Sequence, residues 1–163
     1  MSFIGIIADK KNEIEIENLL QNKLKKQNIE IIKVNEKSIN NIKNVKFNTI
    51  LISGINQVFK YNNLIIKLLK ETHYLVINND IEEILKAVFN LETIVISYGF
   101  NSKSTITASS VSDEEMLICV QREFDNIQRQ KVELQEVSIK KISKNEYNSL
   151  GIATICLLYG INS

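Results

Sequence analysis

Residues 97–111 read SYGFNSKSTITASSV, and the pattern of the whole chain changes within them. Before Gly99, short apolar runs alternate with segments whose apolar residues have helical spacing. After Gly99, apolar and polar residues alternate, as in STITA (104–108), which is typical of a strand with one exposed face. We therefore expect this stretch to join two kinds of β-structure. Its many hydroxyl groups leave a ligand site as the alternative.

The first hundred residues predict alternating strands and helices. Strands are expected at 3–8, 29–34, 47–53, 74–78 and 93–98, and helices at 13–24, 57–71 and 81–89. Tyr61 is expected on the apolar stripe of the second helix. Asp80, followed three residues later by Glu83, is expected to cap the third helix. This order predicts an α/β fold with a mostly parallel sheet and flanking helices.

The remaining residues predict a small antiparallel sheet at 101–142 and a buried helix at 143–163. The strands of this sheet are expected at 104–108, 116–121 and 132–139, with a bulge between Leu134 and Val137 where the apolar residues change face. Charged residues 121–130 predict a hairpin. SKNE (143–146) has the pattern of a capping box, and Gly160 is placed to end the last helix. We expect a single domain over residues 1–163.

Composition excludes several kinds of partner. The chain has 163 residues and a net charge of +1, so no strong field favours nucleic acid or an anionic membrane surface. The first residues lack the pattern of a signal peptide. Cys119 and Cys156 both lie in apolar runs and are expected to be reduced, buried thiols. These features predict a cytoplasmic protein, and no spacing of residues predicts a metal or another cofactor.

Three segments resemble the central domain of the Mur ligases, ATP-dependent enzymes that add amino acids to peptidoglycan precursors. They are SYGFNSKSTITASSV (97–111), HYLVINNDIEE (73–83) and NEYNSLGIATICLLYGI (145–161). The family has a strand that ends in Tyr-Gly-Phe, a strand that ends in Asn before an acidic pair, and a Gly-X-His-Asn turn before an Ala-rich helix. The resemblance implies a P-loop-related α/β fold and covers about the second half of the chain.

The first half departs from that family. Its first strand would lead into a Gly-Thr-Asn-Gly-Lys-Thr loop that holds ATP phosphates. The matching residues here are FIGIIADKKNEIEIENLL (3–20), which lack those glycines and the Lys-Thr pair. Glutamates at 13, 15 and 17 would repel phosphate. Tyr147 stands where the family has histidine, and both flanking domains of the family are missing. The resemblance thus implies a central domain that has lost its ATPase chemistry.

Weak candidates for a ligand site follow the predicted parallel strands, because ligands of open α/β sheets bind beyond the carboxyl ends of the strands. These candidates are Asp9, Ser53, Gly54, Asn56, Asn78 and Asn79. The single histidine, His73, has no nearby residue in the sequence that would act with it in catalysis or metal binding, and it is expected at the surface or the core edge. Tyr98, Gly99 and Phe100 are expected to form a structural joint, with Gly99 adopting an unusual backbone angle.

Three hypotheses for the function follow. The first is a non-catalytic Mur-ligase-like protein that binds an unknown protein or associates with itself. The resemblance alone implies a connection with cell-envelope or developmental processes. The second is a protein that binds a nucleotide fragment or a cell-wall precursor at the strand ends. An enzyme with replaced chemistry comes last, because no nucleophile–base pair and no catalytic residue can be identified.

Overall fold

The computed structural model describes residues 1–61 and 63–162, without the side chains of residues 60 and 61, so the prediction for Tyr61 lies outside the described side chains. Its main sheet is mixed, in the order β10-β7-β6-β5-β4-β3-β1-β2. The strands are β1 (Ser2–Ile7), β2 (Ile29–Lys33), β3 (Thr49–Ile52), β4 (Tyr74–Asn78), β5 (Ile94–Tyr98), β6 (Ile106–Val111), β7 (Glu115–Val120) and β10 (Gln135–Lys140).

The strands β1 to β6 all run parallel to one another, and β7 and β10 run antiparallel to their neighbours. A separate two-stranded antiparallel sheet contains β8 (Phe124–Asp125) and β9 (Lys131–Val132). The expected α/β class and mostly parallel sheet are therefore confirmed. The small antiparallel sheet is the hairpin predicted from the charged residues 121–130. The three C-terminal strands that we expected to form a separate antiparallel sheet instead continue the main sheet as β6, β7 and β10.

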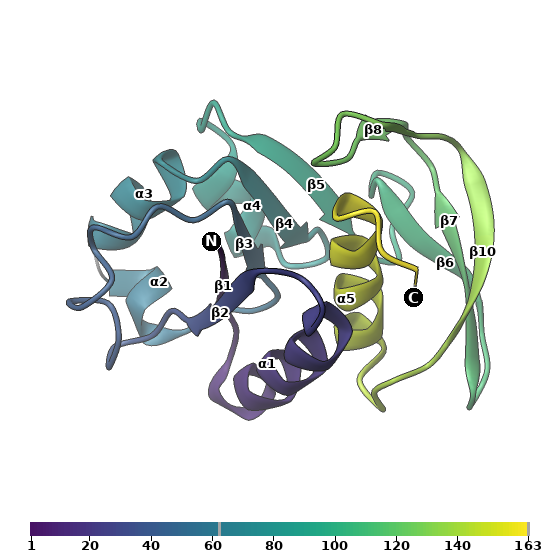
Figure 1. Cartoon of the computed structure of the whole chain (residues 1–163), viewed down its shortest axis with the longest axis horizontal. Coiled ribbons are helices and arrows are strands. Elements are labelled where there is room, and N and C mark those ends of the chain that lie inside the picture. Colours follow the sequence, from purple (N-terminus) through teal and green to yellow (C-terminus); the bar gives the residue numbers. More distant parts are fainter. Residues whose placement is uncertain (62, 163) are drawn as a thin grey trace.

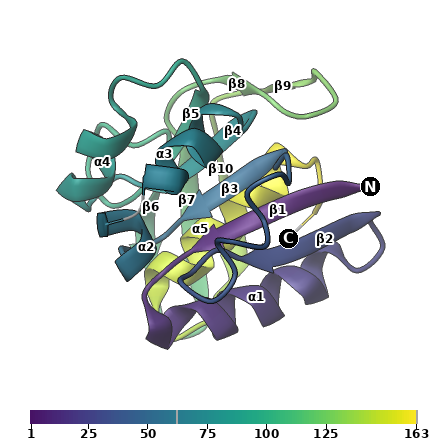
Figure 2. The ribbon, with the colours of Figure 1, turned by 90° about the vertical axis from the view of Figure 1, so that its left-hand side faces the viewer.

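Helices cover the two faces of the sheet in different ways (Figures 1 and 2). One face carries α1 (Lys10–Leu24) and α5 (Glu146–Leu158), whose apolar side chains share one core with Ile6, Val76 and Ile118. The other face carries α2 (Gln57–Tyr61), α3 (Asn63–Lys70) and α4 (Glu82–Val88), which pack on residues such as Ile50 and Ile77. Successive strand residues point to opposite faces, so the central strands are apolar throughout.

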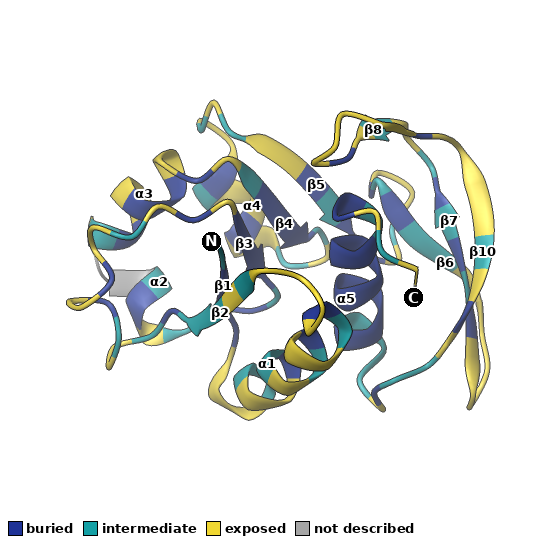
Figure 3. Cartoon of the chain, in the orientation of Figure 1, coloured by how far each residue is buried: buried dark blue, intermediate teal, exposed yellow. Residues whose placement is uncertain are grey.

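The C-terminal helix is largely buried, as expected from its sequence (Figure 3). It lies against β4, β5, β6 and α1, which explains why it is apolar nearly all round. Its last turn ends as predicted at Gly160, whose φ is +67°. The N–H groups of Gly160 and Ile161 donate to the carbonyls of Leu157 and Cys156, which is the Schellman pattern of helix ends.

Several expected boundaries and caps were wrong. The helix predicted from residue 13 begins at Lys10, because Asp9 accepts a hydrogen bond from the N–H of Asn12. Asp80 does not cap α4, whose N-cap Ile81 makes no side-chain hydrogen bond. The cap of α5 is Asn145, one residue before the helix, in place of the expected capping box from Ser143.

Two expectations about the C-terminal strands also fail. The bulge lies between Ala108 and Ser110 of β6, and the change of face near Leu134 marks the gap between β9 and β10. Cys119 is half-buried on the face of β7 that lacks a helix, where its thiol contacts Glu136, while Cys156 is buried as expected. Both thiols are free, and His73 is exposed at the core edge beside Tyr74.

The apolar stripe of α4 is wider than the face that it buries. Ile84 and Val88 are buried, whereas Leu85 and Phe89 are exposed, Phe89 to 83%. The neighbouring start of β5 exposes Ile94 and Val95. Sequence spacing could not separate the buried from the exposed apolar residues of the α4 segment, because three- and four-residue spacing places all four of them on one side of a helix.

Candidate functional site

The carboxyl ends of β1, β3, β4 and β5 lie along one edge of the sheet, where ligands bind in open α/β folds. The strand order reverses between β1 and β3, since β1 lies between β2 and β3. The structure divides the residues predicted at this edge into two groups. Asp9, Ser53, Gly54, Asn56 and Asn78 surround the reversal point, and Asn79 belongs to a separate network with Asp80.

Asp9 closes the first turn of α1 with its own side chain. Its carboxylate accepts from the backbone N–H of Asn12 at 3.0 Å and from the Asn12 side-chain amide at 2.9 and 3.0 Å. The first N–H groups of a helix are the groups that bind phosphate in nucleotide-binding loops. A negative side chain therefore holds the position that an anionic ligand would need.

The neighbouring turn packs tightly against this cap. A Cβ atom on Gly54 would lie 3.2 Å from the backbone nitrogen of Asp9, so only glycine fits there without a shift. Asn56 donates to the carbonyl of Val34 and accepts from the N–H of Phe59. Asn78 donates to the carbonyl of Ser53 at 3.4 Å and accepts from the N–H of Asp80. These polar groups hold loops together.

A shallow depression of about 290 Å³ remains beside the reversal point. Asp9 and Asn56 line it, together with Lys10, Glu36, Ile55 and Gln57, whereas Ser53 and Asn78 are not part of its lining. The predicted crevice thus exists only around Asp9 and Asn56.

The second group centres on the carboxylate of Asp80. Its oxygens accept from the N–H of Phe100 at 2.8 Å, from the side-chain amide of Asn101 at 2.6 Å and from the hydroxyl of Tyr147 at 2.8 Å. Asn79 extends the network, because its amide reaches Asn101 and its own carbonyl accepts from Asn101. The network joins the ends of β4 and β5 to the first turn of α5.

The protonation states in this network suit a structural role at neutral pH. Partial burial of Asp80 raises its pKa, but the hydrogen bonds from Phe100, Asn101 and Tyr147 outweigh that effect, so the pKa lies below its usual value. Burial and the hydrogen bond to Asp80 raise the pKa of Tyr147 to about 12. Tyr147 is therefore a proton donor to an ionised carboxylate, and a phenol with this pKa is a poor general base at neutral pH.

Tyr98, Gly99 and Phe100 lie at the end of β5, in the connection to its parallel neighbour β6, and the main sheet continues across this connection without a change of strand direction. Tyr98 is fully buried in the core, while Phe100 is exposed and packs edge-on against Tyr147 with ring centroids 5.1 Å apart. The backbone of Gly99 has a φ of +159°, and a Cβ there would lie 2.8 Å from a carboxylate oxygen of Asp80. The close approach of Asp80 thus requires glycine, more than the backbone angle does.

A second polar cluster, which the sequence did not predict, connects α1 to α5. The amide of Asn148 donates to Asn12 at 3.1 Å and to Glu15 at 3.1 Å, and the hydroxyl of Ser143 also donates to Glu15. Asn148 is 3% exposed, so its hydrogen bonds are needed to offset burial of the amide. The sequence signal that could have predicted this cluster is Asn148, an asparagine within a helix that was expected to be buried.

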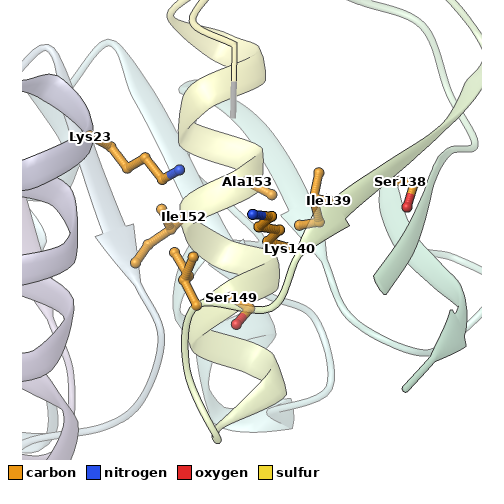
Figure 4. Close-up of a pocket in the computed structure, with 8 residues that line it drawn as sticks. Lys23, Ser138, Ile139, Lys140, Ser149, Ile152 and Ala153 are labelled. Carbon is orange, nitrogen blue, oxygen red and sulfur yellow. The ribbon is translucent and has the colours of Figure 1, made fainter. Parts of the chain in front are cut away.

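A cavity of about 280 Å³ lies away from the strand ends, between α1, α5 and β10 (Figure 4). Ile152 and Ala153 of α5 form its floor, and Ile139 borders it from β10. The side chains of Lys23 and Lys140 extend over this floor from opposite sides.

Comparisons with known proteins give no family for this chain. No protein-family model matches the sequence, and no curated protein matches it either. Within residues 1–61 and 63–162, no group of three His, Cys, Asp or Glu side chains is placed to hold a metal ion. None of the helices among these residues is long and apolar enough to cross a membrane.

Proposed function

We propose that this chain is a non-catalytic, Mur-ligase-like cytoplasmic protein that acts by binding another protein or a second copy of itself. The observation that carries the proposal is the Asp9 carboxylate at the start of α1, bonded to the N–H of Asn12. In the enzymes that the sequence resembles, this place belongs to the phosphate-binding loop. A carboxylate there, with Glu13 in the first helical turn, opposes nucleotide phosphate.

Exposed surface supports the association part of the proposal. The face of β6, β7 and β10 opposite α5 carries no helix within the described residues (Figures 1 and 3). Four exposed apolar side chains also lie within residues 85–95, namely Leu85, Phe89, Ile94 and Val95. A surface where such side chains adjoin one another would be typical of protein–protein contacts.

The first experiment compares nucleotide binding with association. The purified chain would be heated with Mg-ATP, ADP, UDP-sugars and muropeptide fragments, and its mass would be followed by sedimentation across concentrations. A ligand at 100 times its dissociation constant adds about 2.7 kcal/mol, which raises the melting temperature by about 5–10 °C. We expect no such shift with nucleotides. ATP hydrolysis that copurifies with the protein, or a clear nucleotide shift, would contradict the proposal.

A second candidate function is binding of a small ligand without turnover. The depression beside Asp9 and Asn56 supports it, because it lies where the strand order reverses. Substitution of Asn56 by Ala would then reduce a thermal shift produced by a cell-wall precursor. A shift that is equal in both proteins would place the ligand elsewhere.

A further inference from the structure

The last strand of the main sheet, β10, has one free edge. It pairs with β7 on one side, and no strand of the described residues lies on its other side. The N–H of Lys141 donates to the carbonyl of Glu114, which is the residue directly opposite it in the register. Hydrogen-bonded and non-hydrogen-bonded positions alternate along an antiparallel pair. Val137 and Ile139 therefore bond to β7, and the backbone groups of Glu136, Ser138 and Lys140 point to the free edge.

These outward residues have self-complementary charges. If two copies of β10 pair antiparallel about a twofold axis at Ser138, each Glu136 lies directly opposite Lys140 of the second copy. The same axis places Val137 opposite Ile139 on the face that packs on α5. Shifting the axis by one residue toward Val137 would place Lys140 opposite Leu134. The charges thus favour the register centred on Ser138.

Only a long hydrogen bond, 3.5 Å from the Cys119 thiol to Glu136, holds either charged side chain among the described residues. Glu136, Ser138 and Lys140 are exposed, and neither charged side chain has a salt bridge within the described residues. Lys140 extends over α5 in the single chain (Figure 4), and its long flexible stem lets the amine turn to the outer face. The edge strand at the opposite end, β2, differs because Lys33 already pairs with Glu17.

We propose that two copies of this chain associate by antiparallel pairing of β10 with β10 about Ser138, which joins their main sheets into one. This inference rests on the proposed function and names its partner as a second copy. Paired backbone groups supply the attraction, as in other cases of strand addition at a sheet edge. The Glu136–Lys140 pairs set the register, and an isologous contact of this kind closes as a dimer.

Charge reversal tests the register directly. Glu136→Lys and Lys140→Glu would each place like charges opposite one another at both ends of the pairing. We expect each variant to raise the dimer dissociation constant about tenfold or more, since two favourable pairs become unfavourable. The double variant Glu136→Lys/Lys140→Glu restores opposite charges and should return dimerisation to near the original level. Glu133→Lys makes the same charge change outside the paired stretch and serves as the matched control.

A backbone variant tests the pairing without charge. Ser138→Pro removes an N–H group that points to the free edge, and the bonds of Val137 and Ile139 to β7 remain. We expect it to be a monomer with the circular dichroism spectrum of the original chain. An edge contact is smaller than a standard interface and is expected to be weak, so sedimentation should cover protein concentrations of about 10–500 µM.

The outcomes separate this inference from the proposed function. A chain that is monomeric throughout the concentration range overturns β10 pairing but leaves a different protein partner, and therefore the proposed function, intact. A dimer that is insensitive to both single charge reversals and to Ser138→Pro also overturns it, because the contact then lies elsewhere. Nucleotide hydrolysis by the purified chain would contradict the proposed function whether or not β10 pairs.

Discussion

Two buried tyrosines differ in how their hydroxyl groups are satisfied. The hydroxyl of Tyr159 lies 2.8 Å from that of Thr49, and both groups are buried. The hydroxyl of Tyr98 is buried beside Gly151 and has no hydrogen-bond partner among the described residues. Burial raises the pKa of both phenols, which are therefore neutral in the folded protein at neutral pH. A buried hydroxyl without a partner costs free energy that the apolar ring alone would not.

Phenylalanine substitutions should separate these two cases. Tyr159→Phe leaves the Thr49 hydroxyl unpaired, so we expect it to lower the free energy of unfolding by about 1–3 kcal/mol. Tyr98→Phe removes an unpaired group and should leave stability unchanged or increase it. Urea unfolding followed by circular dichroism measures both. A loss above about 1 kcal/mol for Tyr98→Phe would indicate a buried water bound to its hydroxyl.

The charge of Asp80 should make part of the stability depend on pH. Its pKa is lowered in the folded chain, so ionised Asp80 stabilises the fold above the usual value of 3.8, and this contribution is lost as the pH falls through the folded pKa. At pH 7 we expect Asp80→Asn to cost about 1 kcal/mol, a small value because the side chain is exposed. The difference in melting temperature should disappear at low pH.

Asp113→Asn provides the control for this pH series, since Asp113 lies in an exposed turn between β6 and β7. It should behave like the original chain across the same range. An effect of Asp80→Asn that is the same at pH 3 and pH 7 would show that the carboxylate charge is not what stabilises the network.

At the scale of the elements, the geometry of the turn between β5 and β6 depends on close contacts at Gly99. A methyl group on Gly99 would lie 2.8 Å from a carboxylate oxygen of Asp80 and 3.0 Å from the hydroxyl of Ser104. The turn itself is held because the backbone N–H of Phe100 donates to the same carboxylate. The joint and the Asp80 network are therefore one structural unit.

A double-mutant cycle tests that unit. Gly99→Ala should lower the free energy of unfolding by about 1–3 kcal/mol through overpacking. In the Asp80→Ala background the nearest clashing atoms are gone, so the same change should cost less. Urea unfolding of the four proteins gives the coupling energy. Additive effects would show that the strain lies in the backbone at Gly99 and not against Asp80.

On the scale of the whole molecule, α5 connects the two halves of the sheet. It contacts β4 and β5 from the first half, β6 from the second, and α1. Residues far apart in the sequence therefore share one core, which includes Ile16, Val76, Met116 and Ile155. Loss of α5 would uncover apolar side chains on both halves at once.

This shared core predicts one cooperative unfolding transition. The chain contains no tryptophan and five tyrosines, so tyrosine fluorescence and far-ultraviolet circular dichroism are the natural probes. We expect their urea transitions to coincide, as for a single domain over residues 1–163. Separate midpoints would instead indicate that the parallel half unfolds independently of β7, β10 and α5.

Sequence patterns alone determined the class of the fold and the order of its main elements. Apolar runs predicted β1 to β5, and the apolar sequence of α5 predicted its burial and its end at Gly160. These features depend on local spacing and on residues that have special backbone freedom, so they can be read along the chain. The change of strand direction was predicted too early, because β6 still runs parallel to β5 and antiparallel pairing begins only between β6 and β7.

Only the tertiary structure decided which polar groups meet. Asp80 has the local pattern of a helix cap, yet its carboxylate bonds to Tyr147, which is distant in the sequence. Likewise, the sequence made Asp9 a ligand candidate, and the tertiary structure placed its carboxylate on the N–H of Asn12. A hydrogen bond depends on distances that strand pairing and helix packing set together. For the same reason, the free edge of β10 exists only once the order of the strands is known.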